Sequence, residues 1–239
     1  MLVVRGKTVR TNVYVDGFNL YYGAGKYTPY KWLDLAALCN RLLPATTTLN
    51  YIRYFTAEIA DDPSDPQRLQ RQRLYLRALR TTPNLTIHLG HYIETPARMR
   101  LANPVAGEPD IVDVIKTEEK GSDVNLGAWL LLDAHNGYFD QAIVISNDSD
   151  LATPIWMIKK VFGLSIGVWN PHSKATCDRW NAAHPGCHPR TPHPSYKLKK
   201  AAKFQVAISS DGAESDVAQC QFSEEIKDGT GTFRRPKGW

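Results

Sequence analysis

Four aspartates lie where short apolar segments of the sequence end, or in the turn before a predicted helix. Asp16 directly follows a β-prone run, Asp148 and Asp150 follow the run AIVIS at 142–146, and Asp123 lies in a polar turn. Carboxylates gathered in one place repel one another unless a cation neutralises them, and Mg²⁺ and Mn²⁺ prefer such oxygen ligands. A water held by these ions can attack a phosphodiester bond. The four acids therefore predict a divalent-metal site.

Strand-like and helix-like segments alternate through the part of the chain that carries these acids. The patterns predict strands at 12–15, 50–56, 85–89, 111–115, 142–146 and 164–169, and helices at 32–43, 66–80, 123–135 and 151–162. Strands that alternate with helices form a mostly parallel sheet covered on both faces. The predicted fold class is therefore α/β, a three-layer sandwich. The carboxyl ends of parallel strands share one edge, where ligands bind, so the acids should meet there.

The composition changes beyond residue 170. The segment HPGCHPRTPHP at 184–194 is too rich in proline for a regular element and is expected to be a surface loop, whereas 204–209 could add a late strand. We predict one domain at 10–170 and a C-terminal extension at 171–239 that is partly packed on it.

Composition narrows the class of protein. The 239 residues carry a formal net charge of +5, which allows a polyanionic partner. No apolar run is long enough to span a membrane, and the N-terminal residues do not resemble a signal peptide. A soluble, cytoplasmic protein without a membrane partner is expected. The four cysteines lack Cys-x-x-Cys spacing and are interpreted as free thiols.

Simpler explanations exist for single acids. Asp150 could cap the helix that follows it, and Asp16 with Gly17 could form an ordinary turn. The coincidence of acids at three separate positions on one predicted edge favours a shared site. Of the neighbours Glu118 and Glu119, at most one should contribute a further ligand, because adjacent residues of an extended chain point in different directions.

Several residues could support such a site. Asn19 could orient Asp16 or only stabilise its own turn, and Ser146 has the same ambiguity. Lys120 could meet a substrate phosphate. The helix at 66–80 could present a face that follows a phosphate backbone, or a solvated surface, through its basic residues Arg68, Arg71, Arg73 and Arg77.

Three blocks of the sequence resemble the signature blocks of the NYN domains, in particular the LabA-like branch of the PIN-like nuclease superfamily. The blocks are VYVDGFNLYY at 13–22, KGSDVNLGAWLLLDA at 120–134 and VISNDSDLATPI at 144–155. The resemblance implies a Rossmann-like parallel sheet of strand order 3-2-1-4-5 and a metal-dependent ribonuclease site. Residues that match family positions are Asp16, Asn19, Asp123, Asp148 and Asp150, while Asn147 stands where many relatives have glycine.

Residues and resemblance together predict a metal-dependent nuclease that acts on RNA rather than DNA. Its cofactor would be Mg²⁺ or Mn²⁺, held by Asp16, Asp123, Asp148 and Asp150, which would also be its catalytic residues. Two alternatives stay open: a non-catalytic RNA-binding regulatory module and a metal-dependent phosphatase. A homo-oligomer is also considered.

Overall fold

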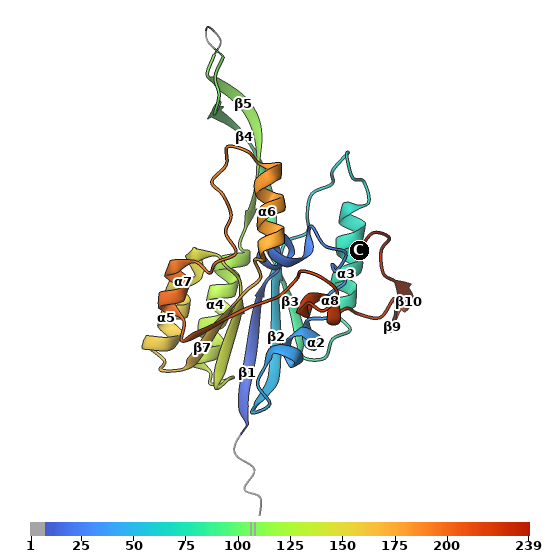
Figure 1. Cartoon of the computed structure of the whole chain (residues 1–239), viewed down its shortest axis with the longest axis vertical. Coiled ribbons are helices and arrows are strands. Elements are labelled where there is room, and N and C mark those ends of the chain that lie inside the picture. The colour runs from blue at the N-terminus through green and yellow to red at the C-terminus, as the bar shows by residue number, and fades with distance from the viewer. Residues whose placement is uncertain (1–7, 106, 108) are drawn as a thin grey trace, which may run out of the picture.

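The computed structural model describes residues 8–105, 107 and 109–239, and its centre is a parallel sheet. In this part of the chain the sheet has six strands in the order β3-β2-β1-β6-β7-β8 (Figure 1). The strands are β1 (Val9–Asp16), β2 (Thr47–Thr56), β3 (Leu85–Leu89), β6 (Gln141–Ile145), β7 (Ser165–Asn170) and β8 (Phe204–Ala207). Every neighbouring pair is parallel. The predicted α/β fold class is confirmed.

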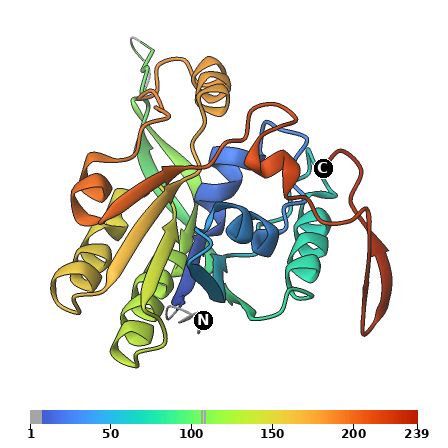
Figure 2. The ribbon, with the colours of Figure 1, turned by 60° about the horizontal axis from the view of Figure 1, so that its bottom comes forward.

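Helices cover both faces of the sheet (Figure 2). One face packs against α4 (Ser122–His135), α5 (Ala152–Lys160) and α7 (Tyr196–Ala201), and the other against α2 (Leu35–Leu42), α3 (Arg68–Leu79) and α8 (Asp216–Gln219). Successive residues of a strand point to opposite faces. Accordingly Val13 and Val15 enter the core beneath α2 and α3, while Tyr14 enters the core beneath α4 and α5. Both faces of the sheet are buried, so its strands require the apolar runs from which they were predicted.

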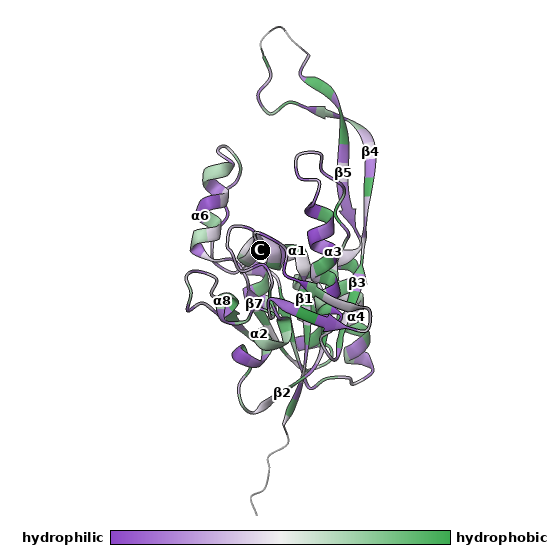
Figure 3. Ribbon diagram, turned by 90° about the vertical axis from the view of Figure 1, so that its right-hand side faces the viewer, coloured by the Kyte–Doolittle hydropathy of each residue, from purple (hydrophilic) through white to green (hydrophobic). Residues whose placement is uncertain are grey.

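One predicted strand lies outside this sheet. The segment at 111–115 belongs to β5 (Ile111–Lys120), which pairs antiparallel with β4 (His91–Arg100) in a separate two-stranded hairpin. Figures 1 and 3 show this hairpin projecting from the body of the protein. The prediction of a strand from these β-branched residues is correct, but its assignment to the central sheet is wrong. Ile115 is 65% exposed and packs against no core.

Counted without the hairpin, the central strands follow the order 3-2-1-4-5 predicted from the family resemblance, with β8 added at the end. The reversal of strand order falls between β1 and β6. Ligands of open α/β sheets bind at such a reversal, outside the carboxyl ends of the strands.

The residues beyond 170 are closely joined to the rest. After α6 (Lys174–Ala183), the described residues at 184–194 form no helix or strand, as expected from their prolines. The chain then supplies α7 and β8, and β8 pairs with β7 of the central sheet. A last hairpin, β9 (Glu225–Asp228) and β10 (Gly231–Arg234), follows near α3. Among the described residues, no helix is both long and apolar enough to cross a bilayer.

The turn after β1 requires a glycine. Here α1 (Gly17–Leu20) leads directly into a short π-helix, η1 (Tyr21–Gly25). A Cβ atom at Gly17 would lie 2.6 Å from the Cζ and Oη atoms of Tyr54 and 2.8 Å from the carbonyl oxygen of Phe55. The backbone of α1 is therefore held against β2 at a distance that no side chain permits.

We expect Gly17→Ala to lower the free energy of unfolding by about 1 to 3 kcal/mol, since overpacking forces a shift of backbone or neighbouring rings. Urea denaturation measures this change. The matched control is Gly229→Ala, because a Cβ there meets no atom within 4 Å. Equal denaturation midpoints for the two variants would contradict the close approach.

Candidate functional site

Three of the four predicted acids line one cavity at the carboxyl edge of the sheet. Asp16 ends β1, Asp148 follows β6, and Asp123 lies in the first turn of α4. All three border a cavity of about 360 Å³, beside the reversal of strand order. Asp150, the fourth predicted acid, is not among the residues that line it. We refer to this space as the acid cavity.

Asp16 is the most deeply buried of these acids, with 6% of its surface exposed. Its Oδ1 accepts a hydrogen bond from the backbone N–H of Asn19 at 2.9 Å, and its Oδ2 accepts one from the hydroxyl of Ser146 at 2.9 Å. Burial raises the pKa of Asp16 to about 7; the charges of Asp123 and Asp148 act in the same direction, and the two hydrogen bonds oppose them. This carboxyl group can therefore gain or lose a proton near neutral pH.

The pKa of Asp123 is raised as well. Burial raises its pKa to about 6, with help from the negative charges of Asp148, Glu119 and Asp150. Glu119 also lines the acid cavity and accepts hydrogen bonds from the backbone N–H and the hydroxyl of Ser122, at 3.1 and 2.8 Å. As expected for adjacent residues, only one of the two glutamates belongs to the cavity.

The turn after β6 is held by polar side chains. The side-chain oxygen of Asn19 accepts a hydrogen bond from the backbone N–H of Asn147 at 2.8 Å. The hydroxyl oxygen of Ser146 accepts a hydrogen bond from the backbone N–H of Asp148 at 2.9 Å. Asp148 in turn accepts from the backbone N–H of Asp150 at 2.9 Å and caps the short helix η2 (Ser149–Leu151). Asp150 does not cap α5, contrary to the simpler explanation considered for it. Asn19 and Ser146 therefore position the loops that carry the acids.

Lys120 does not reach the acid cavity. Its Nζ lies 3.5 Å from a carboxylate oxygen of Glu118, and half of its side chain is exposed. Glu118 also pairs with Lys116 at 2.8 Å. These groups form a surface charge cluster on β5 and not a contact for a ligand in this cavity.

The cavity contains residues that were not among the predicted site residues. The additional lining residues are Phe18, Tyr22, Tyr92, Ser122, His172 and Arg190. Tyr92 comes from the projecting hairpin, while His172 and Arg190 come from the segment beyond residue 170. Burial and the neighbouring Arg190 charge lower the pKa of His172.

The side chain of Asn147 binds the backbone at the end of the proline-rich segment 184–194. Its side-chain nitrogen donates to the carbonyl oxygen of His193 at 3.2 Å, and its side-chain oxygen accepts from the backbone N–H of Ser195 at 2.7 Å. The same nitrogen lies 3.3 Å from Nδ1 of His172. A glycine at position 147 could make none of these contacts. Asn147 therefore helps to hold the C-terminal segment over the sheet edge, together with Asn170, whose side-chain nitrogen donates to the carbonyl oxygen of Pro192 at 2.9 Å.

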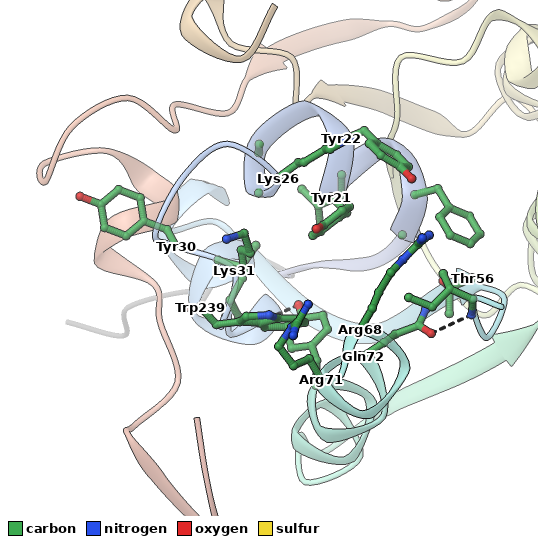
Figure 4. Close-up of a pocket in the computed structure, with 18 of the residues that line it drawn as sticks. Tyr21, Tyr22, Lys26, Tyr30, Lys31, Thr56, Arg68, Arg71, Gln72 and Trp239 are labelled. Atoms are coloured by element: carbon green, nitrogen blue, oxygen red, sulfur yellow. Dashed lines mark hydrogen bonds between the residues drawn. The ribbon is translucent and has the colours of Figure 1, made fainter. Parts of the chain in front are cut away.

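A second cavity, of about 420 Å³, lies between α1, η1 and α3 (Figure 4). Phe18 and Tyr22 line both cavities and so separate them. The second cavity is bordered by tyrosines and by four cationic side chains: Lys26, Lys31, Arg68 and Arg71. We refer to it as the cationic cavity. Its volume falls within the range of about 300 to 1,000 Å³ that small-molecule sites occupy.

The arginines of α3 are each engaged by an acid. The pairs are Arg68 with Asp62, Arg71 with Asp65, Arg73 with Glu58 and Arg77 with Asp228. Arg77 also stacks over the ring of Phe233, 4.1 Å from its centroid. These four guanidinium groups do not form an unpaired basic face. Nucleic-acid binding by this helix, and self-association of the chain, stay predictions.

Comparisons with known proteins add a functional indication. A scan against protein-family models found no match. The chain is 34% identical over 188 residues to 6-hydroxy-3-succinoylpyridine 3-monooxygenase HspA of Pseudomonas putida (strain DSM 28022 / S16), a match that covers 69% of this chain and 60% of that protein. The chain thus spans less than two thirds of that relative's length. A crystal structure of a protein of unknown function from Vibrio parahaemolyticus RIMD 2210633 is similar with a TM-score of 0.49 and 17% identity, covering 88% of this chain and 98% of that one.

The similarity to a monooxygenase overturns the function predicted from the sequence. The prediction of a metal-dependent nuclease or ribonuclease is wrong, and so are its alternatives of a phosphatase and a non-catalytic RNA-binding module, because the curated relative is an oxidoreductase. The predicted Mg²⁺ or Mn²⁺ cofactor is wrong for the same reason. Among the described residues, moreover, no three His, Cys, Asp or Glu side chains are placed so that they could hold a metal ion. The predicted grouping of the acids is nevertheless correct for Asp16, Asp123 and Asp148, which line one cavity.

Proposed function

We propose that this protein is an oxidoreductase of the monooxygenase type that acts on a small hydroxylated nitrogen heteroaromatic. The observation that carries the proposal is the 34% identity over 188 residues to a monooxygenase that is named for a hydroxypyridine substrate. The two adjoining cavities support it, because one offers titrating carboxyl groups and the other offers aromatic walls. The cytoplasm is the proposed location.

The acid cavity supplies a base for such a substrate. A monooxygenase reaction places one atom of dioxygen in the substrate and releases the other as water, consuming two electrons and two protons. Loss of the proton from a ring hydroxyl makes the ring electron-rich and more reactive toward an oxygen electrophile. Asp16, with a pKa of about 7, is suited to accept that proton, since a general base works best when its pKa lies near the operating pH. Asp123, with a pKa of about 6, can pass the proton on toward solvent.

The two electrons are proposed to come from a reduced flavin or nicotinamide. In dinucleotide-binding α/β proteins the pyrophosphate rests on the helix N-terminus after the first strand. Here that position is taken by the carboxyl group of Asp16, which accepts the backbone N–H of Asn19. Asp123 and Asp148 add negative charge beside it. The turn after β1 therefore does not offer the pyrophosphate site of dinucleotide-binding proteins, and we propose that the reductant is a diffusible co-substrate that does not use this turn.

Membership of the NYN domains stays a proposal. The three sequence blocks support it, and the strand order of the central sheet agrees with it. The proposal concerns descent and fold, and it carries no nuclease activity.

Oxygen uptake tests the proposed function. With 6-hydroxy-3-succinoylpyridine and either reduced nicotinamide or reduced flavin mononucleotide, we expect substrate-dependent consumption of dioxygen. Isotopically labelled dioxygen should place one labelled atom in the organic product. Asp113→Asn, a change on the exposed hairpin, should leave the rate unchanged. Uptake that does not depend on the pyridine with either reductant would refute the proposal.

A further inference from the structure

We propose that the cationic cavity binds the carboxylate tail of an anionic aromatic substrate, with the ring directed toward the acid cavity. The inference rests on the proposed function for its substrate class, and it adds where each end of the molecule is held. Among the described residues, four cationic side chains and two carboxylates line the cationic cavity. This excess of positive charge lies inside a concave space and not on an open surface.

Two of the four cations lack a carboxylate partner within the described part of the chain. The Nζ of Lys31 donates to the carbonyl oxygen of Gly238 at 3.2 Å, and the Nζ of Lys26 lies over the rings of Tyr22 and Tyr27, 5.0 and 5.4 Å from their centroids. Each ammonium group has three donors, so both retain capacity for an anion. Burial and the nearby Arg71 and Arg235 charges lower the pKa of Lys31. A bound anion would act against those charges and raise the pKa of Lys31.

The two arginines of the cavity are held in place by acids. Arg68 pairs with Asp62 at 3.3 Å, and Arg71 pairs with Asp65. Figure 4 shows Arg71 and Lys31 extending toward Trp239, and Arg68 extending toward Tyr22. The arginines are thus fixed in orientation, whereas the lysines supply the unpaired charge. A single carboxylate matches this arrangement better than a long polyanion, because the paired arginines leave no extended basic track.

The walls of the cavity suit an aromatic molecule. Tyr21, Tyr75 and Trp239 line it, and the Trp239 ring is itself fixed by Tyr75 and Trp32, at centroid distances of 5.8 and 6.4 Å. Rigid aromatic rings bind flat ligands with little loss of conformational freedom. An aliphatic anion would leave this surface uncovered.

Charge sets the orientation of the substrate. A carboxylate in the acid cavity would be repelled by Asp123 and Asp148, whereas in the cationic cavity it is attracted. Phe18 and Tyr22 line both spaces, so the two cavities adjoin at these side chains, and we place the ring at this boundary with its hydroxyl toward Asp16. A hydroxylated ring with an acidic tail satisfies both ends at once.

Isothermal titration calorimetry with 4-oxo-4-phenylbutanoate tests this inference without turnover, because the probe has an aromatic ring and a carboxylate but no ring hydroxyl. We expect the wild-type protein to bind it, and Lys31→Met to weaken binding by roughly tenfold through loss of a charge-assisted hydrogen bond. The neutral analogue 1-phenylbutan-1-one should bind the wild type more weakly and be insensitive to Lys31→Met. Lys227→Met, on the exposed strand β9, is the matched control and should bind as the wild type does.

Three results would overturn the inference: no binding of the probe to the wild type, equal loss with Lys31→Met and Lys227→Met, or displacement of the probe by an equal concentration of inorganic phosphate. The last would show that the cavity binds anions regardless of the ring. Failure of the proposed function is a separate outcome. In that case the probe binds and responds to Lys31→Met, yet no pyridine-dependent oxygen uptake occurs.

Discussion

Replacing Asp16 by asparagine is expected to remove a loss of stability that the wild-type protein shows as the pH rises from about 4 to about 7. The folded-state pKa of Asp16 is raised to about 7 from an ordinary value of 3.8. Between these values the folded protein keeps a proton that the unfolded chain has released, so its stability falls with increasing pH. A difference of this size between the folded and unfolded pKa corresponds to a free energy on the order of 4 kcal/mol. An amide of similar size carries no such proton.

Urea denaturation at pH 4.5 and pH 7.5 measures this effect in the wild type and in Asp16→Asn. Asp123 titrates in the same direction, so the difference between the two proteins isolates the contribution of Asp16. If both proteins lose the same stability between these pH values, the Asp16 carboxyl group is not buried as described.

The same variant should lower the proposed oxygenation rate by roughly 10²- to 10⁴-fold, the usual contribution of a general base. Ser146 and Asn19 can still hydrogen-bond an amide at position 16, so the turn should keep its shape. A folded variant with full activity would show that another group accepts the proton.

The central sheet was predictable because its strands are buried on both faces. Runs such as 142–145 are continuously apolar, and only a covered strand needs that pattern. The pattern at 111–115 looks similar, yet it arises from pairing within an exposed hairpin. Periodicity reports β structure in both cases, but it does not identify the partner strand.

The acids of the site were also predictable, because parallel topology brings the ends of β1 and β6 together. Their chemistry was less accessible to sequence reasoning. Whether carboxylates hold a metal or a proton depends on how deeply each is buried and on its hydrogen bonds, and these are set by tertiary packing. Asp16 is almost fully buried, which favours the protonated form.

Most contributions from the C-terminal segment had no sequence signal. His172 lies two residues beyond the end of β7, at the carboxyl edge of the sheet, but Arg190 belongs to a loop that is held by Asn170 and by the contact of Asn147 with the backbone of His193. The contact spans 46 residues and follows no periodic pattern. Trp239 likewise reaches the cationic cavity from the far end of the sequence.

A buried ion pair beneath α4 was missed for a related reason. Charged residues of a predicted helix are normally assigned to its exposed face, yet the Asp133 side chain is 1% exposed and that of Arg53 is 12% exposed. Two guanidinium nitrogens of Arg53 bind the Asp133 carboxylate at 2.7 and 2.9 Å, and the hydroxyl of Tyr14 donates to it at 2.6 Å. The Arg53 guanidinium also lies 4.2 Å from the ring centroid of Trp129. The group fastens α4 to β1 and β2.

We expect Asp133→Ala to lower the free energy of unfolding by about 3 to 5 kcal/mol, because it leaves a buried guanidinium group without its counter-charge. The Tyr14 hydroxyl also loses its acceptor. Urea denaturation at neutral pH measures the loss. The control is Asp178→Ala, which breaks a pair whose side chains are 78% and 58% exposed and should change stability by less than about 1 kcal/mol.

A triple variant separates the cost of an unpaired charge from the loss of packing. In Tyr14→Phe, Arg53→Met, Asp133→Leu, no polar group of the cluster is left without a partner, and apolar side chains of similar size fill the space. Replacing a buried ion pair in this way is often neutral or stabilising, so the triple variant should recover most of the stability that Asp133→Ala loses. If the triple variant is as unstable as Asp133→Ala, the cluster stabilises the fold through its ionic geometry itself. If Asp133→Ala costs no more than Asp178→Ala, water must reach the guanidinium of Arg53, and α4 does not seal this part of the sheet.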